Sequence, residues 1–285
     1  MRKTKLGHSI RAKKVSECLF THCMLIVFAA IYIIPFLWMA ATALKTAQEL
    51  YAYPEAVFPK HPVLDNFTNV FITIPYLQYL GNTIFISVSC VLGFTLTASM
   101  VAYSMSKIDW FGRKWLFPII IGTMMVPTQV TMIPLYMTYQ KIGAVGTYLP
   151  LILPAFCGGP YYIFLLRQFF STVPDCLTEA ARIDGAGEVR TYASIILPLC
   201  VPALISIAVF AFMAAWGDFF NPMLYLNDQS KYTISLGLQA FMSENKVEWG
   251  QLMAASTLFT LPTIILFFFA QKSFIEGIAV TGIKS

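Results

Sequence analysis

The chain has 285 residues, of which 58% are hydrophobic and only 12% are charged. Because a normal soluble surface cannot cover so apolar a chain, the composition excludes an ordinary water-soluble protein. We attribute the formal net charge of +5 to the arrangement of loops around a lipid bilayer, and we expect no nucleic-acid partner.

Six apolar runs are each long enough to cross the bilayer as a helix, which takes about 20 residues. The first run follows a basic segment at residues 1–17, and its length favours an uncleaved helix over a signal peptide. We predict an all-α membrane protein with a single transmembrane domain over residues 1–285 and a cytoplasmic tail at 275–285. The six predicted transmembrane helices are residues 18–41, 80–105, 115–139, 148–166, 199–226 and 252–274.

The distribution of Lys and Arg predicts the orientation of these helices, since cytoplasmic loops are enriched in both residues. If both termini lie in the cytoplasm, 14 of the 19 basic residues are cytoplasmic and five lie outside. We therefore predict an N-in/C-in topology. It places residues 167–198, a charged segment between the fourth and fifth helices, in the cytoplasm.

The loop after the first predicted helix, residues 42–79, contains four prolines and predicts an ordered but irregular cap on the outer side. The second predicted helix then carries Ser89, Gly93 and Thr97 at helical spacing. Small residues in such a stripe let membrane helices pack closely, and we favour packing over a pore-lining role.

Prolines are unusually dense in the third and fourth predicted helices. A proline inside a helix leaves a carbonyl without its partner, and that carbonyl needs a neighbouring helix or a wet cavity. Gln129 lies between Pro127 and Pro134. This stretch either presents polar groups to a translocation path or forms a purely structural kink, and both interpretations stay open.

The segment at residues 167–198 contains a short predicted helix with a narrow face of small side chains. Gly185 and Gly187 should stop this helix, because glycine adopts a positive φ without steric penalty. Pro174 is tolerated in a first turn, and Thr172 or Asp175 is available as an N-cap. The narrow face consists of Leu177, Ala180, Ala181 and Asp184.

The fifth predicted helix contains Asp218, the one acidic residue inside an apolar run. An ionisable group there is costly and is therefore a functional hypothesis by default. Pro222 follows four residues later and should free the Asp218 carbonyl. Asp218 either meets the translocated substrate or caps and hydrogen-bonds a neighbouring helix near the outer interface. Its predicted face is Ala211, Ala214, Asp218, Asn221 and Tyr225.

Several motifs together resemble one known family. Glu179-Ala180-Ala181, then Asp184-Gly185-Ala186, then Pro198 and Pro202 resembles the EAA signature of membrane subunits of bacterial ATP-binding-cassette importers. Trp216-Gly217-Asp218-Phe219, and Leu44-Lys45-Thr46 with Asn66-Phe67, resemble the carbohydrate-uptake branch, the maltose-permease type. The resemblance implies a permease subunit whose EAA loop, a short cytoplasmic coupling helix between helices 4 and 5, docks on a separate ATPase.

The resemblance also implies the partners and the place of the protein. Two ATP-binding-cassette ATPase subunits would bind ATP and Mg, and a second, homologous permease subunit would complete the pore. An extracytoplasmic solute-binding protein would deliver a sugar, oligosaccharide or related polyol at the bacterial inner membrane. We assign ATPase coupling to Glu179, Ala180, Ala181, Asp184, Gly185 and Ala186. We assign the substrate pathway to Trp216, Asp218, Asn221 and Gln129.

The chain contains no G-x-x-x-x-G-K-[ST], H-E-x-x-H or G-x-S-x-G motif. We therefore expect a non-catalytic subunit that binds no cofactor of its own, and the six cysteines, without C-x-x-C spacing, predict neither a disulfide nor a metal site. An ion-coupled secondary transporter is one alternative, but it needs intramembrane charges and repeated halves. A membrane scaffold for a cytoplasmic partner is the other, and it leaves Asp218 and the prolines unexplained.

Overall fold

The computed structural model describes residues 2–53, 55–242 and 247–282, with side chains for residues 17–53, 55–242 and 247–272. Over these ranges the chain is helical and holds no β-strand beyond one isolated antiparallel bridge, Met242 with Val247. The predicted all-α class is confirmed there. The chain forms two compact units, Met1–Thr73 with Phe241–Phe259, and Ile74–Ala240 with Thr260–Ser285.

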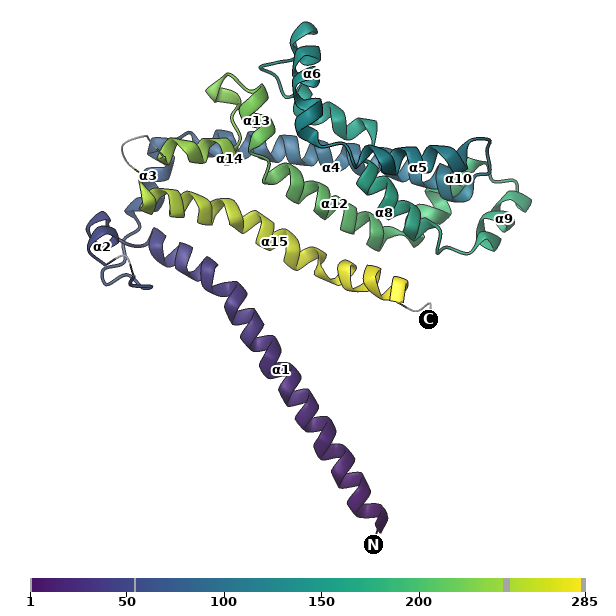
Figure 1. Cartoon of the computed structure of the whole chain (residues 1–285), viewed down its shortest axis with the longest axis horizontal. Helices are drawn as coiled ribbons and strands as arrows, with labels where there is room; N and C mark the ends of the chain where they lie inside the picture. Colours follow the sequence, from purple (N-terminus) through teal and green to yellow (C-terminus); the bar gives the residue numbers. More distant parts are fainter. Residues whose placement is uncertain (1, 54, 243–246, 283–285) are drawn as a thin grey trace. The chain divides into compact units, whose positions relative to one another are not determined.

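The first unit contains α1 (Arg2–Ala43), α2 (Ala47–Ala52), α3 (Asp65–Thr73) and the beginning of α15 (Trp249–Gly282) (Figure 1). The predicted first helix lies within α1, which already begins at Arg2, so the basic segment is helical too. In the predicted irregular loop, Asn66 Nδ2 donates to the carbonyls of Ala43 and Lys45 at 2.8 Å each. The buried Lys45 ammonium donates to the Ala56 carbonyl. Lys45 and Asn66, two of the residues that carry the resemblance to the carbohydrate-uptake branch, therefore order this loop.

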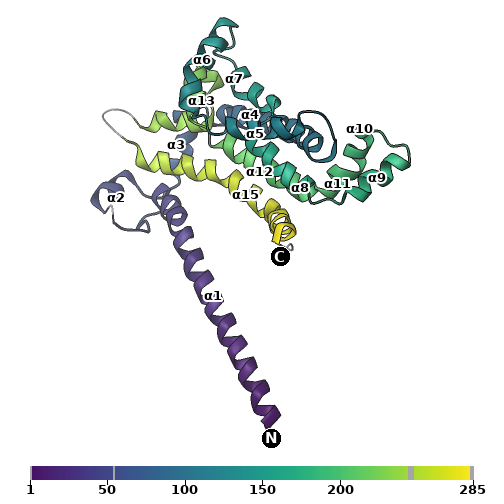
Figure 2. The same ribbon diagram turned by 45° about the vertical axis from the view of Figure 1, so that its right-hand side comes forward.

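The second unit is built on α4 (Tyr76–Lys107), α8 (Pro160–Phe170) and α12 (Val201–Trp216), which pack against one another. Their shared core includes Ala102, Leu166, Phe170, Ile207 and Ala211. The other helices of this unit are α5 (Arg113–Thr123), α6 (Thr128–Lys141), α7 (Leu149–Ile152), α9 (Asp175–Ile183), α10 (Glu188–Thr191), α11 (Leu197–Leu199), α13 (Phe220–Tyr225), α14 (Ile234–Gly237) and the rest of α15. Figure 2 shows α9, α10 and α11 together at one end of this unit.

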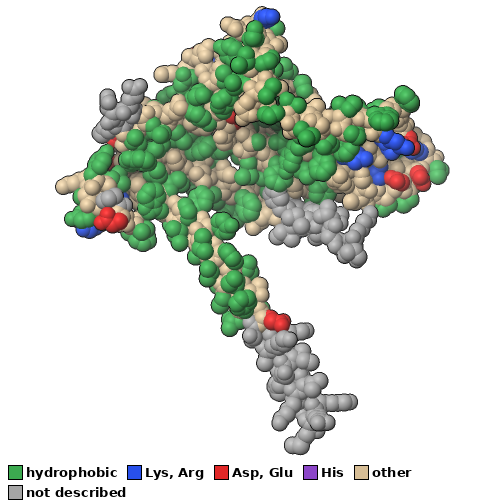
Figure 3. All heavy atoms as spheres, in the orientation of Figure 1, with side chains coloured by type: hydrophobic (Ala, Val, Ile, Leu, Met, Phe, Trp, Pro, Cys, Tyr) green, Lys and Arg blue, Asp and Glu red, His purple; other side chains and the backbone are tan. Residues whose placement is uncertain are grey.

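Among the described residues, four helical stretches are individually long and apolar enough to cross a membrane: Glu17–Ala43, Tyr76–Lys107, Leu149–Phe170 and Trp249–Lys272. They match the predicted first, second, fourth and sixth helices. Residues 275–282 of the predicted tail continue α15, and residues 283–285 lie outside the described residues. In Figure 3, hydrophobic side chains are spread along the second unit, and charged side chains gather at the end of that unit that carries α9 and α10.

The predicted third and fifth helices are not continuous. Arg113–Thr123 and Thr128–Lys141 meet at 94°, because Pro127 lacks an N–H and holds an extended conformation at the start of α6. Glu188–Leu199 and Val201–Trp216 meet at 81°. The predicted run to residue 226 ends early, since α12 stops at Trp216 and the chain restarts as α13. Each bent pair would count as at most one crossing.

The small-residue stripe of the second predicted helix packs, as favoured above. A Cβ on Gly93 would lie 2.9 Å from the Cβ of Ala155, so only glycine permits this approach. Thr97 Oγ1 donates to the Ala155 carbonyl at 3.1 Å. These contacts seat α4 against a 3₁₀ turn at Leu153–Cys157.

Candidate functional site

The segment between α8 and α12 folds as the predicted short helix, α9. Its end is a closed turn in which Gly185 N–H donates to the Arg182 carbonyl at 3.1 Å and Ala186 N–H to the Ala181 carbonyl at 2.9 Å. Gly185 has a φ of +79°, as predicted. Gly187 instead has a φ of −72° and precedes α10 in an extended conformation. Only Gly185 therefore terminates the helix through a left-handed residue.

The predicted narrow face of α9 is divided by the fold. Ala181 is 6% exposed and, with Thr178, faces the interior of the unit. Ala180, Glu179 and Asp184 are exposed. The four residues of the predicted narrow face therefore do not share one exposed side, because Ala181 packs on the unit while Ala180 and Asp184 are exposed. The contact of this face with a partner stays a prediction.

The exposed side of the segment carries large apolar side chains, of which only Leu177 belongs to the predicted narrow face. Ile183 is 86% and Val189 81% exposed, and Leu177 is also exposed. Charged side chains gather at the same end of the unit, the end that carries α9 and α10 (Figure 3). Large apolar side chains exposed beside charged ones make this end of the unit a candidate for contact with another protein.

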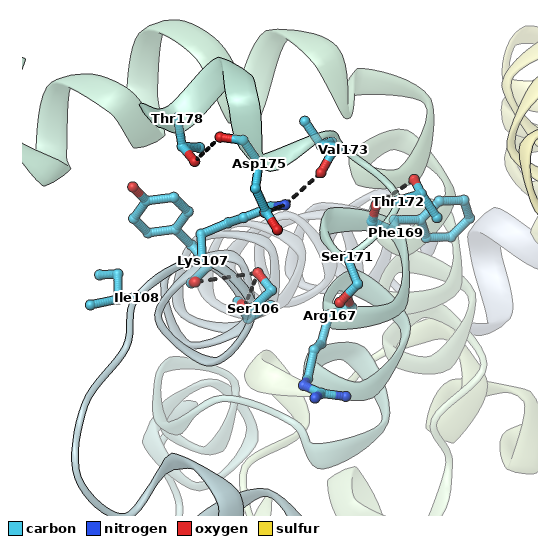
Figure 4. Close-up of polar contacts among 12 residues, drawn as sticks. Ser106, Lys107, Ile108, Arg167, Phe169, Ser171, Thr172, Val173, Asp175 and Thr178 are labelled. Carbon is cyan, nitrogen blue, oxygen red and sulfur yellow. Dashed lines mark hydrogen bonds and ion pairs between the residues drawn. The ribbon is translucent and has the colours of Figure 1, made fainter. Parts of the chain in front are cut away.

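The start of α9 is held by Lys107, the last residue of α4. Its ammonium lies 2.5 Å from the Val173 carbonyl and 2.6 Å from Asp175 Oδ1 (Figure 4). The predicted caps are absent, because the Thr172 hydroxyl donates to Phe169 and the Asp175 carboxylate is turned to Lys107. The pairing of Lys107 with Asp175 could not be predicted from local sequence spacing, because the two residues are 68 positions apart.

The same contact sets the acidity of Asp175. The hydrogen bond from Lys107, followed by the attraction of its positive charge, holds the pKa of the Asp175 carboxyl below its ordinary value. The carboxylate side chain is 74% exposed, whereas that of Lys107 is 2% exposed. The buried partner therefore depends on this contact more than the exposed one does.

Three arginines bind the carbonyl end of α4, where a helix leaves acceptors without partners. Arg167 Nε donates to the Met105 carbonyl at 3.4 Å, Arg182 Nη2 to the Lys107 carbonyl at 3.3 Å, and Arg113 Nη1 to the Ile108 carbonyl at 2.9 Å. Positive side chains there also complement the negative end of the helix dipole. Figure 4 shows Arg167 and Lys107 around this end of α4.

Glu188 attaches α10 to the same helix. It accepts from Tyr103 Oη at 2.7 Å and pairs with Arg182 Nη2 at 3.0 Å. Ser99 lies one helical turn before Tyr103 on α4, and its hydroxyl is 2.7 Å from that of Tyr192, just after α10. Both α9 and α10 are thus joined to the last turns of α4 by polar contacts.

A cavity of about 690 Å³ lies in the second unit and brings together Gln129, Asp218 and Asn221. Ala214 and Tyr225 also line it. The predicted continuous helical face is wrong, since α12 ends before Asp218, yet four of its five residues converge on the cavity. Trp216 does not line it: this side chain is buried and stacks on Phe212 with ring centroids 5.0 Å apart.

Asp218 has a structural task as well as a place in the cavity. Its carboxylate accepts from the backbone N–H of Asn221 at 3.1 Å and from Asn221 Nδ2 at 2.8 Å, which stabilises the start of α13. The Asp218 carbonyl, expected to be free of the helix ladder, accepts from Ser235 Oγ at 2.6 Å. These bonds support the structural interpretation of Asp218, and its contact with a substrate stays a prediction.

Residues 94–280 match the family model described as "Binding-protein-dependent transport system inner membrane component". The chain is 34% identical over 266 residues to the maltodextrin transport system permease protein MdxG of Bacillus subtilis, covering 93% of this chain and 95% of that protein. It is 34% identical to the arabinooligosaccharides transport system permease protein AraQ of Halalkalibacterium halodurans, covering 79% and 81%. The trehalose/maltose transport system permease protein MalG of Thermococcus litoralis is 31% identical, covering 91% and 94%.

A solved structure shares the fold. The bacterial ABC transporter involved in the import of the acidic polysaccharide alginate contains a chain that matches with a TM-score of 0.78 at 21% identity, covering 89% of this chain and 95% of that one. At this identity the likeness concerns the fold alone.

Proposed function

The chain belongs to the family of binding-protein-dependent transport system inner membrane components, and from this premise we propose that it is the permease subunit of an ATP-driven importer for a sugar, an oligosaccharide or a related polyol. It is a multi-pass membrane protein. Relatives named for maltodextrin, arabinooligosaccharides and trehalose or maltose support the carbohydrate class. In this proposal the binding protein and the cavity together determine which sugar is imported.

The charged segment at residues 167–198, here named the coupling segment, carries this proposal. It presents Ile183, Val189 and Glu179 outward and is joined to the last turns of α4. We propose that Glu179, Ala180, Asp184, Gly185 and Ala186 face or shape the contact with an ATPase subunit. Ala181 supports that surface from beneath.

ATP and Mg belong to the partners in this proposal. The chain carries no nucleotide-binding motif, so two ATPase subunits supply the hydrolysis and this subunit is non-catalytic and binds no cofactor. A second, homologous permease subunit completes the pore, and an extracytoplasmic binding protein delivers the substrate. Each partner can be identified by co-purification from the source membrane.

The cavity supplies the substrate pathway in this proposal. Asp218, Asn221 and Gln129 place a carboxylate and two amides among apolar walls, which suits a ligand with many hydroxyl groups. Trp216 acts indirectly, by packing on Phe212 just before the helix break. A cavity of about 690 Å³ is within the range of known small-molecule sites.

The predicted six-helix, N-in/C-in topology is part of the proposal and has a direct test. Cys176, in α9, is an exposed thiol. In a variant that keeps it as the one exposed cysteine, a membrane-impermeant maleimide should label it in inside-out vesicles and not in intact spheroplasts. Labelling from the outside would contradict the orientation.

Transport itself is tested with the reconstituted complex of permeases, ATPases and binding protein. Uptake of radiolabelled maltotriose, arabinotriose or trehalose should require ATP and persist when a protonophore removes the ion gradient. Uptake that stops with the protonophore and ignores ATP would instead support the ion-coupled alternative.

A further inference from the structure

Lys107 carries a buried charge, and both of its partners lie at the start of α9. Its side chain is 2% exposed and contacts the Val173 carbonyl and the Asp175 carboxylate. A buried ammonium is strongly unfavourable unless it is paired and hydrogen-bonded. The place of the first turn of α9 is therefore tied to the end of α4.

The opposite end of α9 is tied to the same turn. Arg182, in the last turn of α9, donates to the Lys107 backbone carbonyl at 3.3 Å and pairs with Glu188 at 3.0 Å. Glu188 in turn accepts from Tyr103, one turn before Lys107. Lys107 thus contacts the beginning of α9 through its side chain and the end of α9 through its backbone.

Helix α4 leads from this contact to the cavity without a break. It runs from Tyr76 to Lys107, and Ile86, Cys90 and Phe94 on it line the cavity. Phe94 lies 13 residues before Lys107, about 20 Å along a helix. The chain bends elsewhere, between α5 and α6 and between α11 and α12. A displacement applied at Lys107 is thereby carried to the cavity wall by one rigid element.

We propose that Lys107 is a positioning residue that joins movement of the coupling helix α9 to movement of α4 at the cavity. This inference rests on the proposed function, since the force on α9 comes from the ATPase partner. The contact is a pair of charge-assisted hydrogen bonds, which are stronger and more directional than neutral ones. Without it, α9 remains on the unit through Ala181 and Arg182 but is no longer held at its first turn.

The test compares Lys107→Met with Lys114→Met, a matched control at an exposed lysine of α5. A spin label on the native, exposed Cys176 reports the mobility of the first turn of α9, in a background where the exposed Cys18, Cys23 and Cys157 are serine. Lys107→Met should raise the label's mobility, and Lys114→Met should not. Lys107→Arg, which keeps a cationic donor, should restore at least part of the order.

The functional measurement is ATP hydrolysed per maltotriose imported by the reconstituted complex. Lys107→Met should raise this ratio about 2- to 30-fold, the range expected when one link of a coupling network is removed, with the ATPase still bound. A merely structural role would instead lower ATPase retention, hydrolysis and import in parallel, and that result would overturn the proposal.

Two further outcomes keep the test decisive. If Lys107→Met does not fold, Asp175→Ala, which removes the exposed partner, should still raise label mobility, and a wild-type spectrum there would refute the inference. If the wild-type complex neither retains the ATPase nor imports any sugar tested, the proposed function fails. If the wild-type complex transports and Lys107→Met leaves the ratio of ATP hydrolysed to maltotriose imported unchanged, only the inference about Lys107 fails.

Discussion

The backbone N–H of Ala186 donates to the carbonyl of Ala181 at 2.9 Å and closes the last turn of α9 across Gly185. This bond requires the chain to reverse through a left-handed residue, and Gly185 supplies it with a φ of +79°. The direction in which α10 leaves α9, and with it the placement of Glu188 against Tyr103, follows from that single conformation.

Gly185→Val should therefore redirect the coupling segment without crowding it, since no atom lies within 4 Å of a Cβ at this position. A left-handed L-residue costs about 1–2 kcal/mol, and more when it is β-branched. We expect a complex that hydrolyses ATP but imports sugar poorly. Gly187→Val is the control, because Gly187 is equally uncrowded but extended. Equal import by the two variants would contradict this account.

Ala181→Trp and Ala180→Trp should separate folding from docking. Ala181 is buried, so the added volume should strain its packing by about 1–3 kcal/mol and lower the thermal stability of the permease. Ala180 is exposed, so the same change should leave stability intact and weaken only ATPase co-purification. The assignment of faces fails if Ala180→Trp destabilises the permease alone in detergent.

Asp218→Asn should distinguish the two tasks of the carboxylate. Asparagine keeps an oxygen for the N–H of Asn221 and removes the charge. We expect reduced uptake at unchanged membrane levels if the charge faces the substrate, whereas Asp218→Ala should also destabilise α13 by about 1 kcal/mol through loss of the cap. Normal uptake by Asp218→Asn would show that the side chain only stabilises the start of α13. Asp228→Asn, at a residue outside the cavity lining, is the control for loss of a negative charge.

The lowered pKa of Asp175 predicts how α9 responds to acid. A carboxyl whose folded pKa is depressed stabilises the fold fully above its unfolded value, about 3.9, and loses that contribution as the pH falls through the folded pKa. The mobility of a spin label on Cys176, in the first turn of α9, should therefore stay constant from about pH 8 to pH 5 and rise only below about pH 4. A rise between pH 7 and pH 5 would show that another group holds the helix.

Local properties of the sequence were enough for much of the fold. The lengths of the apolar runs located α1, α4, the stretch Leu149–Phe170 and α15, because a run of about 20 apolar residues has few alternatives to a membrane helix. Gly185 predicted the end of α9, because glycine alone adopts a positive φ without steric penalty and its identity can be read from one position. The family followed from several short motifs, each made of residues that are close together in the sequence.

The tertiary structure alone decided which way those elements face. Spacing placed Ala180 and Ala181 on one face, but only the neighbours of α9 determine that Ala181 is buried and Ala180 is not. From the sequence, Lys107 was only one of the basic residues used to predict the topology. Its pairing with Asp175, 68 residues away, has no local sequence signature. Trp216 and Asp218 are close in sequence, yet the helix break between them sends one into the core and the other to the cavity. Periodicity defines a face of a helix, whereas packing against distant residues defines what that face meets.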